Sequence, residues 1–385
     1  MTAPDARWTL AIDHGTSTTV GAWADVDPRD GWVRVGAVTV DGAPGMPSAV
    51  LSRPDGAVLA GRPALEAGTL DPAAALLRTR PHLAASTGGP PELLTQWPRP
   101  TTAVDVATAL IAKVIRAEAG RRGTLPSSVV LLHPASWSAS AREALRQAGL
   151  AALSAIPYTS PDQLDLLDGP RAAAHRLGGQ GRLLVVDVGG AATELAVVDR
   201  GGDGTGSVTA MRSVNVGAEV LDDALAQLIL DRSPPHLAAR VRFGGDLEAH
   251  RAWYRLRTSV RDAKEALAAQ GTVAVALPVL PPENPVPGVV SLTHADLGAM
   301  LAPGLEEIAQ GISALVGPLS GPRPAMLVRG GLTDMPRVRE WLAERTGFGL
   351  AHGGDPGAVS ATGPASGAAA WAAERLHLGR RQEGR

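Results

Sequence analysis

One stretch near the N-terminus decides the expected fold: residues 10–19, which read LAIDHGTSTT. An apolar run ends at Asp13, and glycine and small hydroxyl residues follow. Phosphate binding needs backbone N–H groups that point into a concavity with no side chain in the way, and these residue types meet that need. Residues 20–26 then read as a strand, whereas a P-loop or dinucleotide fold requires a helix there. The stretch predicts a phosphate-binding turn between two strands.

The same pattern recurs nearly half the chain later. Residues 183–186 are apolar, a glycine loop follows at residues 187–193, and residues 195–199 read as a strand. Such an echo indicates duplicated halves. Asp13 and Asp187 would place two hard oxygen ligands on opposite walls of a cleft, an arrangement that magnesium prefers, through waters and phosphate oxygens. The alternative is that each aspartate only caps a turn.

The remaining pattern is mixed α/β. Ser140 and Glu143 have capping-box spacing at the start of a helix that we expect to stop at Gly149. Another helix is expected around residues 72–80. Further helices are expected at residues 103–119, 169–177, 219–230, 253–269 and 295–315, and strands at residues 129–132 and 325–328.

Composition restricts the function classes. A chain of 385 residues favours two lobes, and its net charge of -2 with only 12 aromatic residues argues against nucleic acid as a partner. There are no cysteines, which excludes disulfides and thiolate chemistry. No signal-peptide pattern and no run of 18 apolar residues occur, so we expect a cytoplasmic protein with no membrane span.

Several motifs, in order, resemble the ATPase domain of the seventy-kilodalton heat-shock chaperone family, in the actin, hexokinase and chaperone superfamily. The similarity covers nearly the whole chain. Each motif alone is weak, but their order and spacing are specific. The similar segments are residues 10–19, 131–150, 170–178, 185–197, 216–222, 255–264 and 327–336.

The resemblance implies an α/β fold of the actin-like ATPase type: two lobes, each with a mixed, ribonuclease H-like sheet flanked by helices, and a nucleotide cleft between them. It implies a first lobe at residues 1–180, with a small subdomain at about 40–100 and a closing C-terminal helix at about 359–377. The second lobe is expected at residues 181–350, with a small subdomain at about 222–320. Residues 378–385 are expected to be a frayed tail.

The resemblance also implies ATP or ADP with magnesium as cofactors and assigns the site. Asp13 and Asp187 would position magnesium through water. Catalysis would involve Asp187, Glu194 and Arg78, with Arg80 the alternative for a missing catalytic lysine. The nucleotide-binding residues implied are Asp13, Gly15, Thr16, Ser17, Thr18, Gly189, Gly190, Ala191, Gly217, Glu219, Lys264, Gly330 and Gly331.

Several departures from the family concern hydrolysis more than binding. Ala192 replaces a threonine beside the transferred phosphate, and Gly169 replaces an acidic residue, with Asp168 one place out of register. The candidate for the family's catalytic lysine is an arginine, Arg78 or Arg80, and its planar guanidinium does not occupy the place of a lysine ammonium. His14, inside the first loop, stands where the family has an apolar residue. Losing one transition-state contact costs about 10²–10³ in rate, so we expect slow turnover.

Three functions remain open. The first is a slow, chaperone-like ATPase whose lobe closure signals to a protein partner. The second is a degenerate nucleotide-binding scaffold without hydrolysis. The Ala- and Arg-rich composition indicates an actinobacterial source, and the truncated chaperone-like layout resembles proteins associated with type VII secretion. The third is a sugar kinase, for which no sugar-binding Asn and Asp cluster is found. Because no peptide-binding domain is expected after Arg385, we do not expect the familiar chaperone action on unfolded clients.

Overall fold

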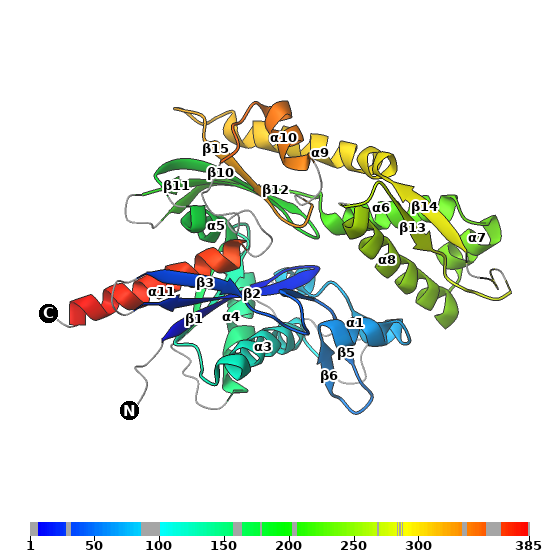
Figure 1. Ribbon diagram of the computed structural model, residues 1–385, viewed down its shortest axis with the longest axis horizontal. Helices are drawn as coiled ribbons and strands as arrows, with labels where there is room; N and C mark the ends of the chain where they lie inside the picture. The colour runs from blue at the N-terminus through cyan, green and yellow to red at the C-terminus, as the bar shows by residue number, and fades with distance from the viewer. Residues whose placement is uncertain are drawn as a thin grey trace.

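The computed structural model describes residues 7–383, except 28–31, 86–100, 157–163, 178, 202–205, 268, 283, 285, 287, 333–336 and 352–362. Two larger sheets face each other across the molecule (Figure 1). The six-stranded sheet has the order β3-β2-β1-β8-β9, with β4 paired to β2. Its strands are β1 (Trp8–His14), β2 (Thr18–Val26), β3 (Val33–Ala37), β4 (Gly45–Pro47), β8 (Ser128–His133) and β9 (Leu164–Asp168).

The four-stranded sheet repeats that arrangement in the order β12-β11-β10-β15. In both sheets a central strand pairs antiparallel with the strand after it and parallel with a strand much later in the chain. The predicted duplication is therefore confirmed at the level of strand order. The strands of this sheet are β10 (Gly181–Val188), β11 (Thr193–Arg200), β12 (Ser207–Val214) and β15 (Ala325–Arg329).

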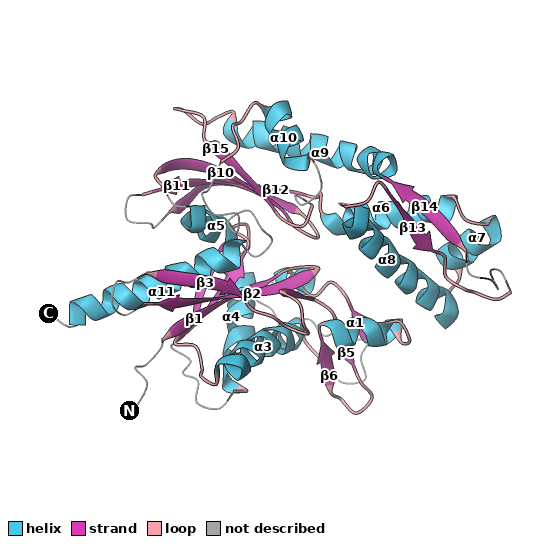
Figure 2. Cartoon of the chain, in the orientation of Figure 1, coloured by secondary structure: helices cyan, strands magenta, loops and turns pink. Residues whose placement is uncertain are grey.

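Helices cover the sheets, and two smaller sheets lie beside the larger ones (Figure 2). The small sheets contain β5 (Val50–Ser52), β6 (Val58–Ala60) and β7 (Ala75–Leu76), and β13 (Thr272–Ala276) and β14 (Val289–Thr293). The α-helices are α1 (Arg62–Gly68), α2 (Arg80–Ala84), α3 (Ala103–Arg122), α4 (Ala139–Ser154), α5 (Gly169–Leu177), α6 (Ala218–Asp231), α7 (Pro235–Phe243), α8 (Leu247–Leu267), α9 (His294–Val316), α10 (Val338–Thr346) and α11 (Gly363–Glu383).

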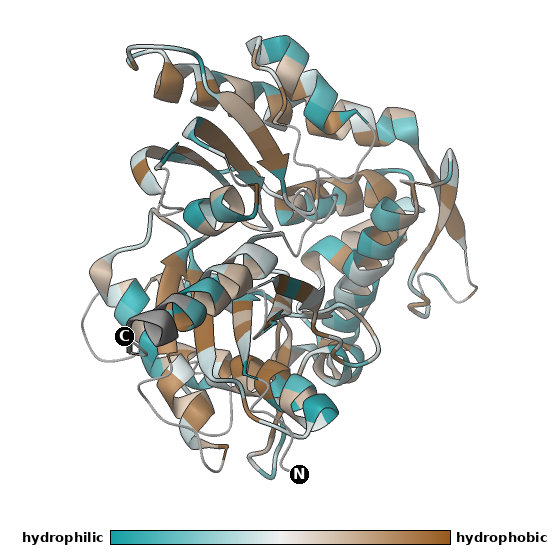
Figure 3. Cartoon of the chain, turned by 60° about the vertical axis from the view of Figure 1, so that its left-hand side comes forward, coloured by the Kyte–Doolittle hydropathy of each residue, from teal (hydrophilic) through white to brown (hydrophobic). Residues whose placement is uncertain are grey.

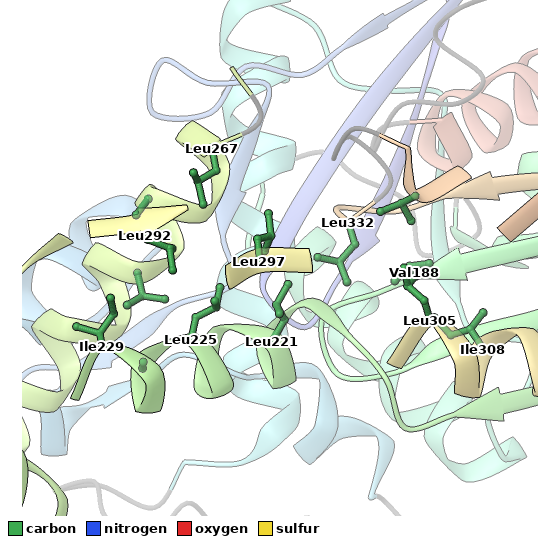
Figure 4. Packing of buried hydrophobic residues seen from close by; sticks show 14 of the residues in the cluster. Val188, Leu221, Leu225, Ile229, Leu267, Leu292, Leu297, Leu305, Ile308 and Leu332 are labelled. Carbon is green, nitrogen blue, oxygen red and sulfur yellow. The ribbon is translucent and has the colours of Figure 1, made fainter. Parts of the chain in front are cut away.

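Separate cores stabilise the two sheets. One packs β1 and β8 against α3 and α4, and the other packs the four-stranded sheet against α6, α8 and α9. Figure 4 shows Leu221, Leu225 and Leu297 of the second core pointing toward one another. Apolar residues concentrate in the strands, whereas the helices carry hydrophilic stretches (Figure 3). Helix α11 lies on β1, β2 and β3 and contacts α5, which in turn contacts β10 and β11, so this helix pair connects the two sheets.

Some local predictions are wrong for identifiable reasons. Residues 72–80 do not form a helix: a 3₁₀ turn at Pro72–Ala74 is followed by β7, which pairs with β5. Helix α4 is capped by the Ser138 hydroxyl, which accepts from the Ala141 N–H, and it continues past Gly149. Gly149 allows close helix–sheet packing, because a Cβ there would approach Leu131 to 2.6 Å.

The C-terminal helix is longer than expected. Helix α11 continues to Glu383, past the expected end at about residue 377. The expected start of this helix, residues 359–362, lies outside the described residues. The described part of the chain contains no helix with the length and apolar character needed to cross a bilayer.

Candidate functional site

A cavity of about 470 Å³ lies between the two larger sheets, within the size range of small-molecule sites. It is built from the ends of β1 and β10, from α8 and from the turn after β15. Most residues predicted to bind nucleotide line it together. These are Asp13, Gly15, Thr16, Ser17, Thr18, Asp187, Gly189, Gly190, Lys264, Gly330 and Gly331.

The first loop is a tight turn between β1 and β2. A Cβ on Gly15 would collide with the Thr18 carbonyl oxygen, so only glycine fits this turn. The Ser48 hydroxyl donates to the Gly15 carbonyl oxygen at 2.8 Å and fixes the loop from outside the cavity. Backbone N–H groups are the donors that such a turn offers to phosphate.

The second loop touches the first. A Cβ on Gly190 would collide with the Ser17 hydroxyl and lie 3.1 Å from the Thr16 Cβ. A Cβ on Gly217 would collide with the Gly190 backbone, and the Glu219 N–H donates to the Gly190 carbonyl oxygen at 2.9 Å. The glycines therefore allow the phosphate-type loops of the two sheets to approach at van der Waals distance.

Lys264 and the turn after β15 also line the cavity. Lys264 on α8 is buried, and its Nζ lies 2.5 Å from the Asp222 carboxylate of α6. Gly330 has φ of 108°, and a Cβ there would collide with the Val188 backbone. Residues 333–336 of the predicted adenosine motif lie outside the described residues.

Other predicted site residues do not line this cavity. Ala191 is exposed, and Gly217 supports the Gly190 backbone from behind. Glu219 is buried and joins the lobes by accepting a hydrogen bond from Ser17 at 2.6 Å.

Glu194, predicted as a catalytic residue, points to the loop before α4, where its carboxylate accepts a hydrogen bond from the Ser136 N–H at 3.0 Å. Burial and the nearby Asp187 raise the pKa of Glu194, against the opposing effect of the Ser136 contact and Arg80.

Arg78, predicted as the catalytic cation, lies away from the other predicted site residues, and its catalytic role stays a prediction. It forms ion pairs with Glu219 and, at 2.9 Å, with Asp223, both on α6, and it does not line the cavity. Arg80 does line it, with Nη1 at 3.7 Å from the Asp13 carboxylate. Arg78 lies between β7 and α2, whereas Arg80 is the first residue of α2, and the two arginines reach different partners.

Sequence reasoning missed Arg329, the last residue of β15. Its Nη2 lies 2.8 Å from the Asp187 Oδ2, and the residue is 3% exposed. The sequence did contain a sign of this residue, because Arg329 ends an apolar strand directly before Gly330. A charged residue is unusual at such a buried position. Burial raises the pKa of Asp13, while the nearby Arg80 and Arg329 oppose that shift.

The donor set fits a resident magnesium ion poorly. Both candidate carboxylates already face an arginine: Asp13 faces Arg80 and Asp187 faces Arg329. Among the described residues, no group of three or more His, Asp or Glu side chains could hold a metal ion. The magnesium prediction therefore stays a prediction, without support from this donor set.

The structure also shows the surroundings of His14 and Asp168, the two residues whose roles the sequence did not decide. His14 is buried between the hydroxyls of Thr19 and Thr79, each at 3.3 Å, and burial together with Arg80 lowers its pKa to about 3. Asp168 accepts from the Arg171 N–H at 2.9 Å at the start of α5 and lines a different cavity, of about 420 Å³. Asp168 therefore does not replace the acidic residue missing at Gly169.

Two mixed sheets that share the order of four strands, flanked by helices and facing a cavity between them, define a two-lobed, actin-like ATPase fold. The chain is 24% identical over 376 residues to the chaperone protein DnaK of Thermoplasma acidophilum, and equally so to that of Thermoplasma volcanium. The DnaK of Cenarchaeum symbiosum is 23% identical over 369 residues.

The similarity covers 92% of this chain but only 57% of each Thermoplasma protein and 53% of the Cenarchaeum one. The chain thus spans little more than half the length of the curated relatives it matches. No family model matches it. The similarity is distant and supports a relationship to the seventy-kilodalton heat-shock and actin-like ATPase group at most.

Proposed function

We propose that the cavity binds a nucleoside di- or triphosphate such as ATP or ADP, and that the bound nucleotide holds the two lobes together. One observation carries this proposal: the glycine loops of the two sheets meet at Gly190 and Ser17, and both loops line the same cavity. Their backbone N–H groups suit the phosphates. Lys264, Gly330 and Gly331, which line the same cavity, suit the ribose and base.

The distant similarity to DnaK proteins gives further support, since a chaperone-like, nucleotide-binding protein is the function class it favours. In this proposal the moving bodies are residues 1–180 and 181–350, with small subdomains at about 40–100 and 222–320. Closure of such a cleft on a nucleotide commonly signals to a protein partner. We propose this role for a cytoplasmic protein, with slow hydrolysis or none.

A scaffold with a degenerate site is the second candidate. The position of Asp168 favours it, because this carboxylate caps α5 instead of facing the cavity. In that case nucleotide would bind and stiffen the fold without being hydrolysed.

A thermal unfolding titration tests the proposal. Ligand at about 100 times its dissociation constant should add about 2.7 kcal/mol to the free energy of unfolding and raise the Tm by a few degrees. ATP, ADP and GTP are compared with adenosine and with tripolyphosphate, which carry the nucleoside part and the phosphate part of the ligand separately. No shift with any nucleotide, with and without magnesium, would remove the proposal.

A further inference from the structure

Arg329 is a buried cation whose hydrogen-bonding capacity is largely unused. Strands β10 and β15 are parallel, and Asp187 and Arg329 are register partners, which places the Nη2 at 2.8 Å from the Asp187 Oδ2. The Nε and Nη1 atoms of Arg329 are also buried, and in the described structure they have no hydrogen-bond partner. Arg329 lines the cavity described above.

Buried polar groups are almost always paired, so unpaired donors at a cavity wall indicate a missing acceptor. A guanidinium presents its N–H groups as a planar fork that matches the oxygens of a phosphate. One side of the Arg329 fork is used by Asp187, and the buried Nε and Nη1 donors are left without an acceptor in a residue that lines the cavity.

A second arginine, Arg80, lines the cavity from the other lobe. It starts α2, its guanidinium lies 5.4 Å from the ring centroid of Trp137, and its Nη1 lies 3.7 Å from the Asp13 Oδ1. Arg80 and Arg329 therefore approach the cavity from opposite lobes, each beside one of the two strand-end aspartates.

The charged side chains around the two aspartates favour a polyphosphate without a metal ion over one that carries magnesium. Two carboxylates alone would attract a divalent cation, but two guanidinium groups beside them cancel their charge. A magnesium ion would be repelled by both arginines, whereas phosphate oxygens would be attracted by them and by the loop N–H groups.

We infer that Arg80 and Arg329 supply the positive charge for a polyphosphate in this cleft, so that the nucleotide binds without a divalent metal. This inference rests on the proposed nucleotide binding and adds that the binding does not require a divalent cation.

Calorimetric titration of the full chain with ATP and with tripolyphosphate tests the inference, in excess EDTA and in millimolar magnesium. We expect dissociation constants that agree within about threefold in the two buffers. Binding in magnesium that weakens tenfold or more in EDTA would overturn the inference and leave the proposed function standing. Absence of binding in both buffers would overturn both.

Arg329→Met provides the variant arm. It should weaken ATP binding at least tenfold in EDTA and make binding magnesium-dependent, because Asp187 is then free of its cation. Arg323→Met is the matched control, since Arg323 is exposed in the same lobe and donates to the Gly347 carbonyl oxygen, and it should leave both constants unchanged.

Unchanged binding by a folded Arg329→Met protein in EDTA would contradict the role of Arg329. Circular dichroism establishes folding. If that variant does not fold, the comparison of EDTA with magnesium on the unchanged protein decides the question by itself.

Discussion

Ser17 in the first loop donates a hydrogen bond to Glu219 of α6 at 2.6 Å, across the line where the two lobes meet. Glu219 is also ion-paired with Arg78, which comes from the first lobe. The Glu219 side chain of one lobe thus binds a hydroxyl and a cation of the other, and the hydroxyl belongs to the first candidate phosphate loop.

Glu219→Gln tests the strength of this contact. The amide keeps an acceptor for Ser17 but removes the charge facing Arg78, so we expect a loss of about 1–3 kcal/mol in the free energy of unfolding. Urea denaturation measures it. Glu143→Gln is the control, because Glu143 is exposed and lies 3.9 Å from Arg146, and it should cost less than about 0.5 kcal/mol. Equal losses in the two variants would refute the prediction.

Gly330 and Gly331 should respond differently to the same substitution. Gly330→Ala puts a Cβ against the Val188 backbone at φ of 108°, and we expect a loss of about 2–4 kcal/mol. Gly331→Ala meets nothing within 4 Å and should change stability by less than about 0.5 kcal/mol. Denaturation of both variants checks this, and a tolerated Gly330→Ala would show that the turn is built differently.

His14 should make the protein sensitive to mild acid. The folded state keeps His14 neutral, with its pKa lowered to about 3, whereas the unfolded chain takes up a proton below the ordinary value of 6.5. The unfolded state binds more protons between these values, so stability falls as the pH falls, by about 1.4 kcal/mol per pH unit from this group.

His14→Gln should therefore flatten the decline in stability between pH 6 and 4, whatever its effect at pH 7. Urea unfolding at pH 7, 6, 5 and 4 measures the slope. His250→Gln is the control, because His250 is exposed on α8, and it should keep the original profile. A slope unaffected by His14→Gln would show that His14 is protonated in the folded protein.

Turnover of ATP should be slow, well below one per second in a single-turnover experiment. The side chain missing at Gly169 is not replaced by Asp168, and Ala192 brings no hydroxyl to the second loop. The double substitution Gly169→Glu with Ala192→Thr restores the residue types of the family and should raise the rate of hydrolysis at least tenfold. Each such contact to the transition state is worth a factor of about 10²–10³ in rate.

Space for the restoring glutamate is available, because the nearest atom to a Cβ on Gly169 is the His133 carbonyl oxygen at 3.9 Å. Ala151→Thr, at an exposed position of α4, is the control and should leave the rate unchanged. An unmodified protein that hydrolyses ATP at about one per second would contradict the prediction.

The sequence alone determined the strand-turn-strand loops and their duplication. An apolar run ending in aspartate and then glycine leaves little choice of local structure, so Asp13 and Asp187 could be placed at matching strand ends. The glycines could be predicted for the same reason, because the collisions that exclude a side chain at Gly15 are local.

Only the tertiary structure decided which cations face those aspartates. Arg78 and Arg80 are two residues apart and chemically identical, and their different partners follow from how β7 and α2 pack on the rest of the molecule. Arg329 meets Asp187 because strands far apart in the chain pair in one register. Long-range register is set by the packing of whole sheets, which no local pattern of residues contains.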